Sequence, residues 1–100
     1  MKSKKDNSVI INDESIITKN IEIDDTDLEG EKVMMNLDKG KYFALNEVGS
    51  RIWGILDESK SINDIANILI KEYAVDYETC KASVRNFIKK LYEDDLVKIN

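Results

Sequence analysis

The residues that could do chemistry in this chain are acidic side chains and one cysteine, because the sequence contains no histidine. Without imidazole there is no Ser-His-Asp triad and no histidine metal ligand. The acidic residues crowd one stretch, at Asp24, Asp25, Asp27, Glu29 and Glu31. A calcium-binding EF-hand loop needs ligands at fixed alternating positions between two helices, whereas this stretch is predicted to be a hairpin. We therefore interpret the cluster as a solvated turn.

The single cysteine, Cys80, falls on the apolar face of a predicted helix, which indicates a small buried hydrophobe. A catalytic thiolate would need a neighbouring base or cation, and the sequence signals none. One cysteine also excludes a zinc site built from cysteine pairs. The four glycines fit neither the dinucleotide-binding nor the phosphate-binding loop pattern. We therefore expect no cofactor, no metal and no enzymatic activity.

The size and charge of the chain narrow the remaining function classes. One hundred residues suit one domain. A net charge of −5 disfavours binding to phosphate backbones and to anionic membranes. The chain has no apolar run of about 18 residues and no signal-peptide pattern, and a lone cysteine fits a reducing compartment. We predict a cytoplasmic protein that binds neither nucleic acid nor membrane.

The elements that must position any binding site divide into strands followed by helices. Residues 1–15 are polar and aperiodic, which predicts a flexible N-terminal tail before a domain spanning residues 16–100. The pattern is β from about Ile16 to Leu45, and Val33, Met35 and Leu37 share one strand face. Asp38-Lys39-Gly40 predicts a turn with a positive φ at the glycine. This stretch therefore predicts a three-stranded antiparallel meander whose third strand is an edge.

From Asn46 onward the apolar residues recur at helical spacing. Asn46, Ser61 and Asp76 are suitable N-caps for three helices, the first of which should end near Glu58. Strands followed by helices predict an α+β fold, winged-helix-like, with a three-stranded antiparallel sheet followed by three helices. Residues 96–99 form a short apolar end with a strand-like pattern. Trp53 lies off the main apolar stripe of the first helix, where it either packs under the sheet or docks a partner.

Residues 33–53, VMMNLDKGKYFALNEVGSRIW, resemble the core motif of the PqqD-like family. Later segments also match, including Glu72-Tyr73-Ala74-Val75-Asp76 and the Val84–Leu91 stretch, so the resemblance covers about residues 20–99. The segment EKVMMNLDKGKYF is most similar to that of the small stand-alone PqqD-like proteins of lasso-peptide pathways. The family often has an aspartate at Asn36 and an acidic residue at Ser83, and this chain departs from it at both positions.

The resemblance implies a recognition element for ribosomally made, post-translationally modified peptides. Its partners would be the leader segment of a precursor peptide and a maturation enzyme, either a leader peptidase with a cyclase or a radical SAM enzyme. The leader would join the sheet beside the third strand, in a groove closed by the third helix. We expect main-chain contacts from Lys41, Tyr42, Phe43, Ala44 and Leu45. The expected groove wall comprises Asp76, Cys80, Ser83, Val84, Phe87 and Lys90.

The sequence is also compatible with two other functions. A winged-helix nucleic-acid-binding protein would need a basic recognition helix, and the third helix mixes four basic residues with several acidic ones. A structural adaptor subunit of a larger enzyme would need no peptide groove. Strand addition instead requires that the edge of Lys41–Leu45 is free to pair with a guest backbone.

Overall fold

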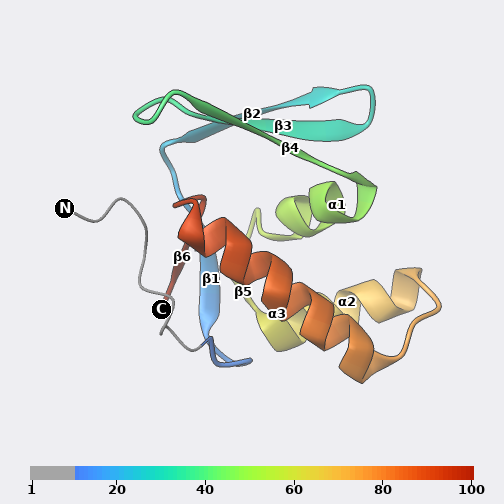
Figure 1. Ribbon diagram of the computed structural model, residues 1–100. Helices are drawn as coiled ribbons and strands as arrows, with labels where there is room; N and C mark the ends of the chain where they lie inside the picture. The colour runs from blue at the N-terminus through green and yellow to red at the C-terminus, as the bar shows by residue number, and fades with distance from the viewer. Residues whose placement is uncertain (1–10) are drawn as a thin grey trace.

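The computed structural model describes residues 11–100, and it has the predicted α+β architecture. An antiparallel meander comes first and three helices follow. The strands are β2 (Ile23–Leu28), β3 (Glu31–Asn36) and β4 (Lys41–Leu45), and the helices are α1 (Glu47–Ile55), α2 (Ile62–Glu72) and α3 (Tyr77–Glu93). All three helices lie on the same side of the meander, with α1 nearest to it (Figure 1).

A second small sheet, which the sequence did not predict, ties the ends of the domain together. Its central strand β1 (Ile16–Lys19) pairs antiparallel with β5 (Lys60–Ser61) on one side and β6 (Val97–Ile99) on the other. The segment expected to open the meander is thus a strand of a different sheet, with Ile17 fully buried. Its partners lie more than 40 residues away, so no local pattern could reveal the pairing. The apolar end at residues 96–99 does contribute a strand.

The segment just before β1 is packed onto the helices. Most of the predicted tail, residues 1–10, lies outside the described residues. In the remaining part, Ile11 is buried and the Asp13 carboxylate accepts two hydrogen bonds from Arg85 Nη2 and one from Nε. The Asp13 carbonyl oxygen also accepts from the Asn63 amide. Ile11 and Asp13, which the sequence assigned to the tail, therefore pack against the folded domain.

The strand register decides which face of the meander is buried. Met34 and Asn36 are buried on β3, whereas Val33 and Met35 are half-buried and Leu37 is exposed beyond the strand end. The apolar face recognised in the sequence is therefore the outer face. Because side chains alternate along a strand, the inner face also carries Asp25, which is directly opposite Met34.

The predicted helix caps are confirmed. Asn46 and Asp76 each accept a hydrogen bond from the backbone amide three residues later, and Ser61 forms a reciprocal capping box with Asp64. Helix α1 ends at Ile55, a little before the expected end near Glu58. Gly40 has the predicted positive φ of 63°.

Two side chains of α1 hold the meander in place. Trp53 is 1% exposed and its Nε1–H donates to Asp25 Oδ2 at 2.8 Å, so it packs under the sheet. The Ser50 hydroxyl accepts from the Lys32 amide at 2.8 Å and donates to the Leu45 carbonyl at 3.1 Å. It thereby bridges the ends of β3 and β4. These contacts fix the position of β4 relative to the helices.

Candidate functional site

The candidate site begins at the free edge of β4. Within residues 11–100, β4 pairs with β3 on one side and with no strand on the other. Alternate residues of an edge strand direct both their N–H and C=O groups outward, where a further strand can pair with them. The expectation that Lys41–Leu45 forms a sheet edge is therefore confirmed.

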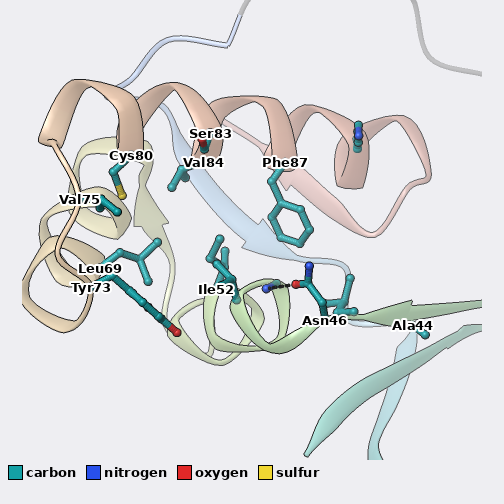
Figure 2. A pocket seen from close by; sticks show the side chains of 14 residues that line it. Ala44, Asn46, Ile52, Leu69, Tyr73, Val75, Cys80, Ser83, Val84 and Phe87 are labelled. Atoms are coloured by element: carbon teal, nitrogen blue, oxygen red, sulfur yellow. Dashed lines mark hydrogen bonds between the residues drawn. The ribbon is translucent and has the colours of Figure 1, made fainter.

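A groove of about 510 Å³ opens beside the end of β4. It lies between α1, α3 and the C-terminal end of α2, and Figure 2 shows Val84 and Phe87 of α3 pointing toward α1 across it. Its fourteen lining residues are Ala44, Leu45, Asn46, Val48, Gly49, Ile52, Leu69, Tyr73, Val75, Cys80, Ser83, Val84, Phe87 and Lys90.

The shape of the groove depends on how the chain turns from β4 into α1. The Asn46 side chain accepts from the Gly49 amide at 2.8 Å, which starts the helix directly after the strand. Gly49 then faces the Phe87 ring, where an added Cβ would lie 3.1 Å from Cζ. A side chain at this position would push the ring, so Gly49 allows α1 and α3 to approach closely.

The chemistry of the groove favours binding over reaction. Most lining side chains are apolar, and Val48 and Val75 remain 43% and 49% exposed at its rim. Burial raises the pKa of the Cys80 thiol, which keeps it protonated and poorly nucleophilic. No group of acidic, histidine or cysteine side chains in residues 11–100 could hold a metal ion. An apolar cleft with a few polar groups suits an apolar ligand.

The structure brings together seven of the eleven predicted site residues. The groove is lined by Ala44, Leu45, Cys80, Ser83, Val84, Phe87 and Lys90. Lys41, Tyr42 and Phe43 continue the β4 edge away from the groove, and Tyr42 is 69% exposed. Asp76 caps α3 through Thr79 and lies outside the lining.

Sequence reasoning missed half of the lining. The residues it did not include are Asn46, Val48, Gly49, Ile52, Leu69, Tyr73 and Val75. Ile52, Leu69 and Tyr73 are among the apolar residues that recur at helical spacing from Asn46 onward, a pattern that predicts a packed stripe on each helix. A stripe identifies the packed side of a helix, but it does not show where packing leaves a gap.

The comparisons with known proteins agree with this geometry. The family model for the coenzyme PQQ synthesis protein D (PqqD) matches residues 31–97. The structure of TbiB1 in complex with the TbiA(beta) leader peptide is 32% identical and superposes with a TM-score of 0.77, covering 81% of this chain and 94% of that one. The chain therefore belongs to the PqqD family.

A second solved structure has the same fold. It is described as lasso peptide synthetase B1 complexed with the leader peptide, and it has 23% identity and a TM-score of 0.73. The similarity covers 82% of this chain and 96% of that chain. No curated protein sequence matches the chain. Within residues 11–100, no helix is long and apolar enough to cross a membrane.

Proposed function

We propose that this protein binds the leader segment of a precursor peptide by adding it as a strand to β4, and that it catalyses no reaction itself. The observation that carries this proposal is the free edge of Lys41–Leu45 beside an apolar groove. The family membership and the leader complex of TbiB1 support it. The guest strand would run antiparallel to β4, with α3 forming the opposite wall.

The main chain of β4 supplies only part of the binding free energy. Five residues offer about four to six outward hydrogen bonds, each contributing roughly 0.5–1.5 kcal/mol. Micromolar affinity corresponds to about 8 kcal/mol, and ordering a flexible peptide costs several more. Side-chain burial must therefore contribute. One leucine-sized side chain placed in the groove adds about 1.5–3 kcal/mol.

The groove also indicates which leader residues it selects. Val84 and Phe87 form an apolar wall that accepts hydrophobic anchors. Lys90 at the groove forms no ion pair with a residue of the described chain, so it is available to an acidic leader residue. Ser83 is exposed and supplies a neutral hydroxyl.

The bound protein would deliver the precursor peptide to the enzyme that processes it. By holding the leader, the protein raises its local concentration near a leader peptidase or modifying enzyme, which does the chemistry. This activity belongs in the cytoplasm, where the lone thiol of Cys80 stays reduced.

Duplex binding has weaker support. Lys81 and Arg85, two of the basic residues of α3, both pair with Asp13. A recognition helix needs such side chains free for phosphates and base edges. Steeply salt-dependent binding to a DNA duplex, with no affinity for leader peptide, would favour the nucleic-acid function instead.

A backbone methylation series tests strand addition. Synthetic peptides would cover the leader of the precursor encoded with this protein, each with one N-methylated amide, and fluorescence anisotropy would report their affinity. Strand addition predicts that affinity falls at every second position, because only alternate amides face β4. Uniform affinity across the series, or a loss without this period of two, would contradict the proposal.

A further inference from the structure

The meander has an outer face that no described helix covers. Cross-strand partners lie on the same face of a sheet, so the register divides the side chains into two sets. Asp25 and Met34 belong to the inner set, because Asp25 bonds Trp53 and Met34 is fully buried. The outer set comprises Asp24, Thr26, Leu28, Glu31, Val33, Met35, Tyr42 and Ala44.

This outer face has an apolar centre and an acidic margin. Val33 and Met35 lie on the central strand, with Leu28 at 57% and Tyr42 at 69% exposure on the flanking strands. The outer set includes two exposed carboxylates, Asp24 and Glu31, and no lysine. Lys32 lies on the inner face, where it pairs with Asp25 and Asp27. An exposed apolar patch with a polar rim is typical of a protein-binding surface.

We propose that this outer face docks the maturation enzyme, through an apolar patch on that enzyme ringed by lysine or arginine side chains. The inference rests on the proposed function in one respect. A leader strand beside β4 would extend the same sheet, and alternate leader side chains would then lie next to Tyr42 on the outer face. The enzyme would bind a composite surface, formed by the outer face together with the leader side chains. This surface is complete only when the leader is bound.

Charge argues against a second copy of this chain as the occupant. Two copies would bring their acidic margins together, and repulsion between like charges is costly at an interface. A partner with a basic rim gains attraction from the same carboxylates, including those of Asp24 and Glu31. The outer face carries carboxylates and no lysine to balance them, which favours a heterologous partner.

The size of the face explains why the leader matters. Three strands of up to six residues span roughly 20 by 14 Å, a projected area of about 300 Å². Stable complexes bury about 800 Å² on each partner, so the sheet alone supports only weak docking. A leader strand widens the sheet by about 5 Å and brings its own side chains to the contact. We therefore expect the enzyme to prefer the leader-loaded form.

The test measures binding of the purified enzyme encoded with the precursor, with and without the synthetic leader. The variant Leu28→Thr/Met35→Thr removes apolar area from strands that do not line the groove. It should weaken enzyme binding to the loaded protein at least roughly tenfold and leave leader affinity unchanged. Asp24→Asn/Glu31→Gln, at exposed positions, should reduce the salt dependence of association. Ile16→Thr, at a 40% exposed position in the other sheet, is the control.

The outcomes separate this inference from the proposed function. If both double variants bind the enzyme with wild-type affinity, the outer face is not the docking surface. If the enzyme binds equally well with and without leader, the leader is not part of that surface. Failure of the leader to bind the wild-type protein would refute the proposed function. The enzyme affinities of the unloaded wild type and variants would still decide the docking face.

Discussion

The two edges of the meander differ in how they meet an approaching backbone. Strand β2 carries Asp24, Asp25 and Asp27 in a six-residue stretch, so a guest strand would meet a row of carboxylates. Strand β4 has the sequence KYFAL and borders an apolar groove at its end. Natural proteins protect free edges with charges, including charges that point inward.

The comparison teaches that an open edge alone does not define a binding site. Asp25 points inward and is held by the Trp53 indole, so the feature that blocks pairing at β2 also fixes the sheet on α1. At β4 the corresponding inner positions are Phe43 and Leu45, which are apolar. Only the β4 edge has apolar side chains and a neighbouring groove, so only there can a guest strand gain binding free energy by burying its side chains.

The largest effect should come from filling the groove beside β4. Ser83→Phe places a bulky ring at an exposed lining position, and it should raise the leader Kd roughly thirtyfold, about 2 kcal/mol, without lowering thermal stability. Ala82→Phe, exposed on the same helix but outside the groove, is the matched control. Anisotropy titrations measure both. Equal Kd values for the two variants would show that the leader bypasses this groove.

A charge reversal at the groove should have an intermediate effect. Lys90→Glu replaces an attraction with a repulsion if an acidic leader residue lies nearby, and we expect a roughly fivefold higher Kd at low salt. Lys89→Glu changes net charge equally from outside the lining. The difference between the two variants should shrink as salt is added. No difference at any ionic strength would remove Lys90 from the binding site.

Neutralising the β2 edge would make the two edges more alike. Asp24→Thr/Asp27→Thr should allow weak edge-to-edge pairing, because β-branched residues suit strands and the repulsive carboxylates are gone. Analytical ultracentrifugation should detect concentration-dependent association at roughly 100 μM, a free energy of about 5 kcal/mol. A variant that stays monomeric at millimolar concentration would show that charge is not what protects this edge.

The smallest effect concerns the side of α3 that faces away from the groove. Hydrogen bonds from Arg85, followed by its charge and that of Lys81, hold the pKa of Asp13 below the usual 3.8. Because the folded pKa is depressed, this stabilisation is present above about pH 4 and is lost as the pH falls through the folded value. Asp13→Asn should therefore cost under about 1 kcal/mol at pH 7 and less at pH 2.

Urea denaturation at the two pH values measures this difference, with the exposed Glu14→Gln as the control. Leader affinity at pH 7 should stay at the wild-type value, because Asp13 lies outside the groove lining. A large loss of leader affinity would mean that this contact also positions the groove wall.

The sequence predicted those parts of the fold that depend on local signals. The caps at Asn46, Ser61 and Asp76 and the turn at Gly40 follow from short-range chemistry, and all were correct. The sheet around β1 depends on partners distant in the chain. Alternation grouped Val33 and Met35 on one strand face, but it did not show that the opposite face, with Met34 and Asn36, is the buried one.

The candidate site was predictable to a similar degree. The edge strand and the α3 flank follow from periodicity, and the resemblance to the family joined them into one groove. The contributions of α1 and α2 depend on the gap left where the three helices pack together, which is a property of three-dimensional packing. Asp76 was expected in the groove wall, but its carboxylate accepts from the Thr79 amide in the cap of α3, and it lies outside the lining.

Amide hydrogen exchange on addition of the leader peptide tests the central claim most directly. Strand addition predicts that the outward amides of Lys41–Leu45 become protected at least roughly tenfold, while those of Ile23–Leu28 keep their rates. Saturating leader that leaves the β4 amides unprotected, or that protects β2 instead, would contradict the account.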